Sequence, residues 1–113
     1  MTYEEIYSRL SSLEGIPVTY YAYPAGQVPD LPFMVYYYPS SNDELADNTN
    51  WCRIEHINVE LYTDNKDIAT EARVEALLNS MGLVYTRAEQ YIQSEAMYEV
   101  LYESEVAITH GTN

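Results

Sequence analysis

The chain has 113 residues, 47% of them hydrophobic, which predicts one folded domain with a modest core and excludes a disordered acidic tail. Its 18 acidic residues outnumber its 5 basic ones, and the resulting formal net charge of −13 excludes tight binding of DNA or of anionic membranes. The single cysteine, Cys52, excludes an intrachain disulfide and a cysteine-based zinc site, and the apolar runs are too short to span a bilayer.

The first residues predict an amphipathic helix over residues 2–13. Its apolar residues recur at spacings of three and four, which places them on one face. Thr2 followed by Glu5 is a capping-box pattern, and Gly15 and Pro17 end the helix. The acidic start lacks the features of a signal peptide, so synthesis in the cytoplasm is expected.

Strands are expected next. Residues 18–23 and 33–38 are β-branched and aromatic, and the segment between them, 24–32, contains three prolines and reads as a loop. An acidic, polar segment over 40–49 is predicted to be a long loop that is mobile in the free subunit. Residues 51–63 then predict a principal strand of a sheet.

The apolar pattern of this principal strand changes phase along its length. The residues from Ile57 to Leu61 alternate on one face, whereas Ile54 is out of step with them. We therefore expect a bulge, or a change of exposed face, near Glu55 and His56.

The second half of the chain predicts a helix and a hairpin. The helix begins at about residue 67 with Asp64 or Asp67 as its cap, and Gly82 closes it. Strands are expected over 83–92 and 97–108.

Tyrosine and glutamate side chains fall on opposite faces of the last predicted strand. Tyr98 and Tyr102 fall on one face, and Glu99, Glu103 and Glu105 fall on the other. Residues 1–108 thus form one predicted domain, with 109–113 as a flexible tail.

The predicted order α-β-β-β-α-β-β corresponds to a two-layer α+β sandwich. Its sheet should be mostly antiparallel or mixed, with both helices on one face. The other face, rich in tyrosine and glutamate, is left open to water or to a partner. The chain has 13 tyrosines against one phenylalanine and one tryptophan, and tyrosine is enriched at protein interfaces.

No arrangement of residues in the sequence predicts catalysis. His56 lies in a strand and His110 in the tail, and Cys52 has no evident partner that would activate its thiol. The acidic loop lacks the alternating oxygen ligands and central glycine of a calcium loop. We therefore expect no enzyme activity, no cofactor and no metal.

Three segments carry a resemblance to a known class of proteins. They are "LPFMVYYYPSSNDELADNTNW" (31–51), "INVELYTDNKD" (57–67) and "MYEVLYESEV" (97–106). In these segments the chain resembles the tail terminator and tail-to-head joining proteins of long-tailed bacteriophages. The resemblance implies an α+β subunit that assembles as a ring, commonly a hexamer, within the virion. Such a ring caps the tail tube, contacts the tail tube protein and the head-completion or connector protein, and lets DNA pass without tight binding. The resemblance also implies that the cytoplasm in which the chain is synthesised is that of a bacterial host.

Candidate interface or channel residues follow from the tyrosine excess and the acidic charge. They are Tyr36, Tyr37, Tyr38, Asp43, Glu44, Asp47, Trp51, Tyr98, Glu99, Tyr102, Glu103 and Glu105. The three consecutive tyrosines should alternate between the two faces of the sheet, and the acidic loop should dock on a neighbouring subunit or line the channel.

Two other functions remain open on the sequence. An acidic DNA mimic that inhibits a nucleic-acid-binding host protein would explain the charge but not the tyrosines. A small enzyme or ligand-binding domain would need a concave site with convergent polar groups.

Overall fold

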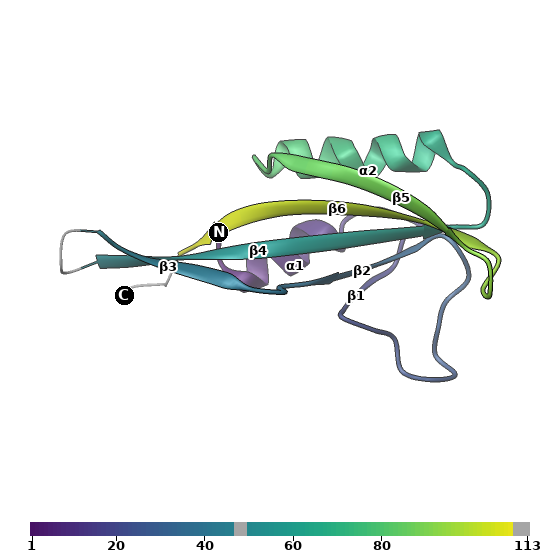
Figure 1. Cartoon of the computed structure of the whole chain (residues 1–113), viewed down its shortest axis with the longest axis horizontal. Coiled ribbons are helices and arrows are strands. Elements are labelled where there is room, and N and C mark those ends of the chain that lie inside the picture. Colours follow the sequence, from purple (N-terminus) through teal and green to yellow (C-terminus); the bar gives the residue numbers. More distant parts are fainter. Residues whose placement is uncertain (47–49, 110–113) are drawn as a thin grey trace.

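The computed structural model describes the backbone of residues 1–46 and 50–109, and the side chains of this part of the chain outside residues 43–52. The chain is elongated, with extents of 50 × 27 × 24 Å (Figure 1). In the described residues the elements follow in the order α1 (Tyr3–Leu10), β1 (Val18–Tyr20), β2 (Phe33–Tyr37), β3 (Ser41–Ala46), β4 (Asn50–Thr63), α2 (Ile68–Ser80), β5 (Tyr85–Ile92) and β6 (Met97–Ile108).

One mixed sheet organises the fold. Its strands run in the order β1-β2-β4-β6-β5, with β3 also paired to β4. Only the β1–β2 pair is parallel among the described strand pairs, and the others are antiparallel. The α+β class and the mixed sheet predicted from the sequence are confirmed.

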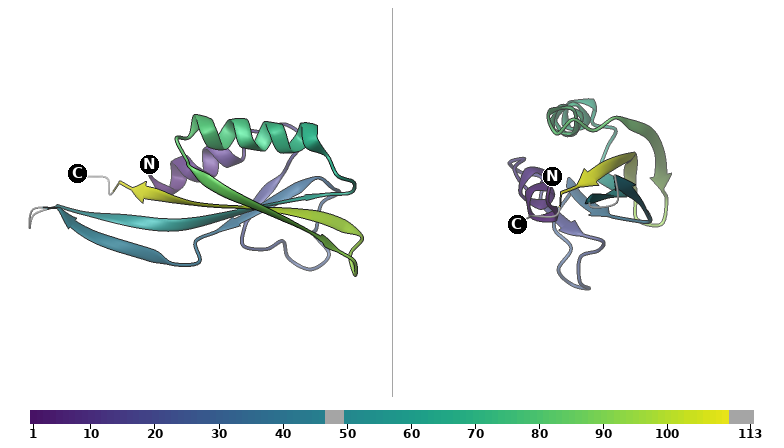
Figure 2. Two further views of the ribbon diagram at one scale, coloured as in Figure 1. Left: turned by 45° about the horizontal axis from the view of Figure 1, so that its top comes forward. Right: turned by 90° about the vertical axis from the view of Figure 1, so that its left-hand side faces the viewer.

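Both helices pack on the same face of this twisted sheet (Figures 1 and 2). Ile6 and Leu10 of α1 and Val74 and Leu78 of α2 are buried in one hydrophobic cluster with the inward-facing residues of β2, β4 and β6. We call this face of the sheet the helix side and the opposite face the open face. The loop between β1 and β2 hangs below the sheet, away from α2 (Figure 1).

Strand β3 corrects the prediction of a polar loop over residues 40–49. Residues Ser41 to Ala46 pair with β4 in an antiparallel register that runs from Ser41↔Glu55 to Ala46↔Asn50. The first residues of β4 extend beyond the end of β2, and their backbone groups would otherwise lack partners on that edge. A polar sequence can supply these partners because strand pairing uses the backbone.

The expected bulge near Glu55 is not on β4. This strand pairs with β6 without interruption, and Glu55 is buried in phase with Ile57. The irregularity lies between β2 and β3, on the strands that pair with β4. Tyr37 pairs with Asn58 and Ser41 pairs with Glu55, so the segment from Tyr37 to Ser41 is one residue longer than the segment of β4 opposite it. Glu55 can occupy a buried position because its Oε2 accepts a hydrogen bond of 2.6 Å from a tyrosine hydroxyl of α1.

The predicted capping box of α1 is confirmed. Thr2 Oγ1 accepts from the backbone N–H of Glu5 at 3.1 Å, and Glu5 Oε1 accepts from the backbone N–H of Thr2 at 2.8 Å. Of the two candidate caps of α2, Asp67 is the one whose side chain accepts from the backbone N–H of Thr70. Both caps satisfy backbone donors that a helix start otherwise leaves exposed.

Replacing Thr2 with alanine is expected to lower the free energy of unfolding by about 1 kcal/mol, because one capping acceptor is lost. Urea denaturation followed by circular dichroism measures this loss. Thr2→Ser keeps the hydroxyl and serves as the control, and an equal loss in both variants would contradict a capping role.

Candidate functional site

The five basic residues of the chain share one location, the helix side of the sheet. They are Arg9, Arg53, Lys66, Arg73 and Arg87. Arg9 of α1 donates to Ser80 Oγ at 2.6 Å, and Arg73 of α2 donates to the backbone carbonyl of Glu14 at 2.8 Å. Both guanidinium groups therefore connect parts of the helical layer.

Arg53 lies on the same side of β4. It is in register with Ile108, which is buried in the core beneath the helices. The pKa of Tyr3 on α1 is raised by burial and by Glu55, and the nearby Arg53 opposes this rise. The Arg53 guanidinium is thus beside α1.

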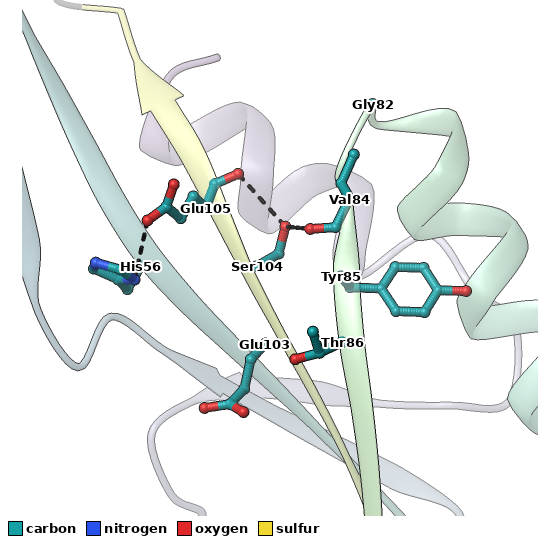
Figure 3. A pocket seen from close by; sticks show the side chains of 8 residues that line it. All are labelled: His56, Gly82, Val84, Tyr85, Thr86, Glu103, Ser104 and Glu105. Carbon is teal, nitrogen blue, oxygen red and sulfur yellow. Dashed lines mark hydrogen bonds and ion pairs between the residues drawn. The ribbon is translucent and has the colours of Figure 1, made fainter.

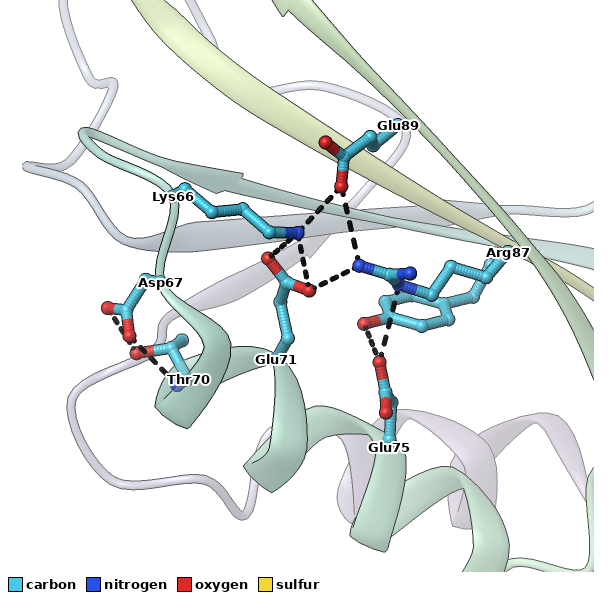
Figure 4. A network of polar contacts seen from close by, with 8 residues as sticks. Lys66, Asp67, Thr70, Glu71, Glu75, Arg87 and Glu89 are labelled. Carbon is cyan, nitrogen blue, oxygen red and sulfur yellow. Dashed lines mark hydrogen bonds and ion pairs between the residues drawn. The ribbon is translucent and has the colours of Figure 1, made fainter.

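The last two cations join α2 to β5 (Figure 4). Lys66 Nζ lies 2.7 Å and Arg87 Nη2 lies 2.6 Å from oxygens of Glu71, which is 3% exposed. Both also contact Glu89, and Arg87 Nε lies 3.5 Å from Glu75. Hydrogen bonds to Glu71 raise the pKa of both cations, and the bond from Lys66 lowers the pKa of Glu89.

Glutamates are the main charged residues of the described part of the open face. Glu60 of β4 and Glu99, Glu103 and Glu105 of β6 lie on it, in adjacent register positions. All five lysines and arginines lie on the helix side. In the described part of the open face, His56 is therefore the basic side chain that is available to these glutamates. The lysines and arginines are therefore confined to the helix side, whereas glutamates lie on both sides of the sheet.

Tyrosine and amide groups occupy the positions that cations would take next to two of these glutamates. The Tyr37 hydroxyl donates to Glu60 Oε2 at 2.7 Å, and the Tyr62 hydroxyl donates to Glu60 Oε1 at 2.5 Å. Gln90 Nε2 donates to Glu99 Oε1. Glu99 is 7% exposed, and its burial raises the pKa of its carboxyl, an effect that the neighbouring Glu60 reinforces.

Glu103 and Glu105 are exposed instead, beside a shallow depression of about 600 Å³ (Figure 3). His56 Nδ1 lies 3.4 Å from Glu105 Oε2 in this depression. The Ser104 hydroxyl donates to the backbone carbonyl of Val84 at 2.6 Å and is not directed at the histidine. The depression therefore does not pair a serine nucleophile with a base.

Tyrosines gather where β1, β2 and α1 meet. Tyr36 and Tyr38 point to the helix side and Tyr37 to the open face, so the predicted alternation is confirmed. Neighbouring rings in the group lie 5.2 to 6.5 Å apart between centroids; the contacting residues are Tyr3, Tyr7, Tyr20, Tyr21, Tyr36, Tyr37 and Tyr38. Such contacts stabilise the group beyond simple burial.

The exposed members of this group are not those expected. Tyr7, Tyr20 and Tyr21 are 49%, 47% and 67% exposed and present the accessible aromatic surface. The adjacent tyrosines at 20 and 21, directly before a proline-rich loop, were a signal in the sequence for this surface.

Burial corrects three of the proposed interface residues, of which Glu99, on the open face, is 7% exposed. Tyr36 is 6% exposed and Tyr102 is 1% exposed, and both belong to the core of the subunit because their strands face the helices. Tyr98 is half-buried and packs against Tyr91, with 4.9 Å between ring centroids.

The remaining candidates belong to the β3–β4 hairpin. Asp43 and Glu44 lie on β3 and Trp51 lies on β4. For these three residues the structure describes the backbone only. Asp47 lies outside the described residues. Their assignment to an interface or a channel stays a prediction.

Comparison with protein-family models and with curated protein sequences gave no match. Within residues 1–46 and 50–109, no helix is long and apolar enough to cross a membrane. In the same part of the chain, no group of three or more histidine, cysteine, aspartate or glutamate residues could hold a metal ion.

Proposed function

We propose that this chain is a structural subunit of a bacteriophage or prophage virion at the head–tail junction. In this proposal it caps the tail tube and joins it to the capsid connector as a ring, a hexamer by the resemblance noted above. The observation that carries the proposal is that the described part of the open face carries glutamates but no lysine or arginine, because all five of these cations lie on the helix side.

A ring that orients this open face inward would have an acidic channel. DNA phosphates are repelled by such a wall, so the duplex can slide through it without adhering. The helix side would then face outward, and ring closure would cover strand edges that an isolated subunit leaves exposed. The tail tube protein and the head-completion or connector protein are the partners in this assembly.

The alternative is an acidic mimic of DNA that binds a host nucleic-acid-binding protein. The same four glutamates favour it. However, Glu60 and Glu99 are held by tyrosine and glutamine side chains, and Glu99 is buried, which leaves Glu103 and Glu105 as exposed charges on this face. A phosphate mimic needs carboxylates that are free to contact its target, so the arrangement supports it less well.

Reversing the exposed charges of the open face tests the channel. In an inducible phage that carries the gene, Glu103→Lys combined with Glu105→Lys is expected to reduce infectious titre by at least about tenfold, because the channel wall would then attract phosphates. The control is Glu4→Lys combined with Glu14→Lys, which makes the same change of charge at exposed positions of the helical layer. Equal titres for the two double variants would contradict an acidic channel.

Deleting the gene separates the possible roles. Filled heads beside tails of uncontrolled length would support termination of the tube, and normal tails without heads would support a joining role. Normal virions would overturn the proposal. Binding of the purified chain to a host DNA-binding protein, lost in Glu103→Lys with Glu105→Lys, would support the mimic instead.

A further inference from the structure

A pair of carboxyl groups lies at the centre of the open face. The Tyr62 hydroxyl is 2.5 Å from Glu60 Oε1 and 3.3 Å from Glu99 Oε2, so the two carboxyls meet around one hydroxyl. A hydroxyl has one proton and donates it to one acceptor at a time. The second carboxyl therefore needs a proton of its own if the two groups are to stay in contact without repulsion.

Among the described residues, the hydrogen-bonding contacts of the pair include no cation that could replace that proton. Tyr37 of β2, Asn58 of β4 and Gln90 of β5 contact the pair or its tyrosines, and all three are uncharged groups. The nearest acidic position along β6 on this face is Glu103, which is exposed, and Glu89 of β5 is bound to Lys66 on the helix side. Burial raises the pKa of Glu99, in accord with a retained proton.

The same tyrosines hold the loop between β1 and β2. The ring of Tyr37 packs against Tyr21 at the start of the loop, with 5.2 Å between centroids. The ring of Tyr62 packs at 5.2 Å against Phe33, which in turn packs at 5.3 Å against Tyr23. The carboxyl pair thus positions the ring of Tyr37, which contacts the loop directly, and the ring of Tyr62, which contacts it through Phe33.

We propose that Glu60 and Glu99 form a latch, which holds the β1–β2 loop against the open face while Glu99 is protonated and loosens it when Glu99 ionises. The inference concerns the subunit alone and does not depend on ring assembly. Its consequence is that the ring of Phe33, which is buried against Tyr23 of this loop, becomes accessible as pH rises.

The direction of the effect follows from linkage. Folding raises the pKa of Glu99. The stabilisation of the folded state by protonated Glu99 is therefore present in full at pH values below the ordinary pKa of a glutamate, and it is lost as the pH rises through the raised pKa. The loop should therefore be better protected in mild acid than at neutral and alkaline pH.

Hydrogen exchange of residues 21–32, corrected for the intrinsic pH dependence of amide exchange, tests the latch between pH 5 and pH 8. The wild-type loop should lose protection by at least about threefold over this range. Glu99→Gln keeps a neutral hydrogen-bonding group, so its loop should stay protected throughout. Glu103→Gln removes the same charge at an exposed position of the same strand and should behave as the wild type.

Carbon-13 NMR of the glutamate carboxyls provides a second measurement, which uses the wild-type chain and does not require a variant to fold. Glu99 should titrate above the exposed glutamates, and the loop should lose protection over the same pH range. An ordinary titration of Glu99, or a loop whose protection is the same at pH 5 and pH 8, would overturn the latch. Identical pH profiles in Glu99→Gln and wild type would also overturn it.

Discussion

Tyr102→Ala is expected to lower the free energy of unfolding by about 4 kcal/mol, enough to unfold a large fraction of a marginally stable domain. Tyr102 is 1% exposed and is among the largest fully buried side chains of the described chain. Its ring packs edge-to-face on Tyr85, with 5.3 Å between centroids, and its hydroxyl donates to Glu75 Oε2 at 2.8 Å. The alanine variant loses this packing and leaves a cavity between α2, β5 and β6.

Urea denaturation monitored by far-ultraviolet circular dichroism measures the change. Tyr102→Phe is the matched control: it keeps the ring and loses the hydrogen bond, so its cost should be about 1 kcal/mol. If Tyr102→Ala kept wild-type stability and lost self-association instead, Tyr102 would be the interface residue that its place in the sequence first indicated.

Glu71→Ala is expected to cost about 2 kcal/mol of folding free energy. Glu71 is buried and accepts from both Lys66 and Arg87, so its removal takes a buried carboxylate partner from two cations at the contact between α2 and β5 (Figure 4). Removing one partner of a fully buried pair commonly costs about 3 to 5 kcal/mol. The cost is smaller here because the side chains of Lys66 and Arg87 are 34% and 40% exposed.

The control for this variant is Glu89→Ala, which removes a second contact of the same two cations from a more exposed position. Its effect at neutral pH should be much smaller than that of Glu71→Ala. Lys66 holds the pKa of Glu89 below its usual range. The contribution of Glu89 to folding stability is therefore present at pH values above the usual pKa of a glutamate, and it is lost as the pH falls through the lowered pKa. Thermal melts at pH 7 and pH 3 measure both effects, and equal losses at pH 7 would contradict a central role for Glu71.

Local patterns in the sequence were sufficient for much of the fold. The capping box at Thr2, the cap at Asp67 and the turn at Gly82 depend on a few neighbouring residues, and each is present in the structure. Alternation along a strand likewise predicted that Tyr37 would face away from Tyr36, because successive side chains of a strand point to opposite faces.

Other features could not be read from local patterns. Strand β3 has a polar sequence with few β-forming residues, and it forms because β4 offers it an unpaired backbone edge. The burial of Tyr102 depends on the position of α2 above β6, and nothing within the strand separates this tyrosine from Tyr98.

The chain's acidity, its tyrosine excess and its α+β class were determined by the sequence alone, because composition and short-range periodicity suffice for them. Only the tertiary structure decided that the basic residues gather on the helix side and that Glu60 meets Glu99 beneath Tyr62. These two glutamates are far apart along the chain and come together because β4 and β6 are neighbours in the sheet. Strand order depends on the packing of the whole domain, and a charge pattern across a sheet therefore appears only once every strand has its place.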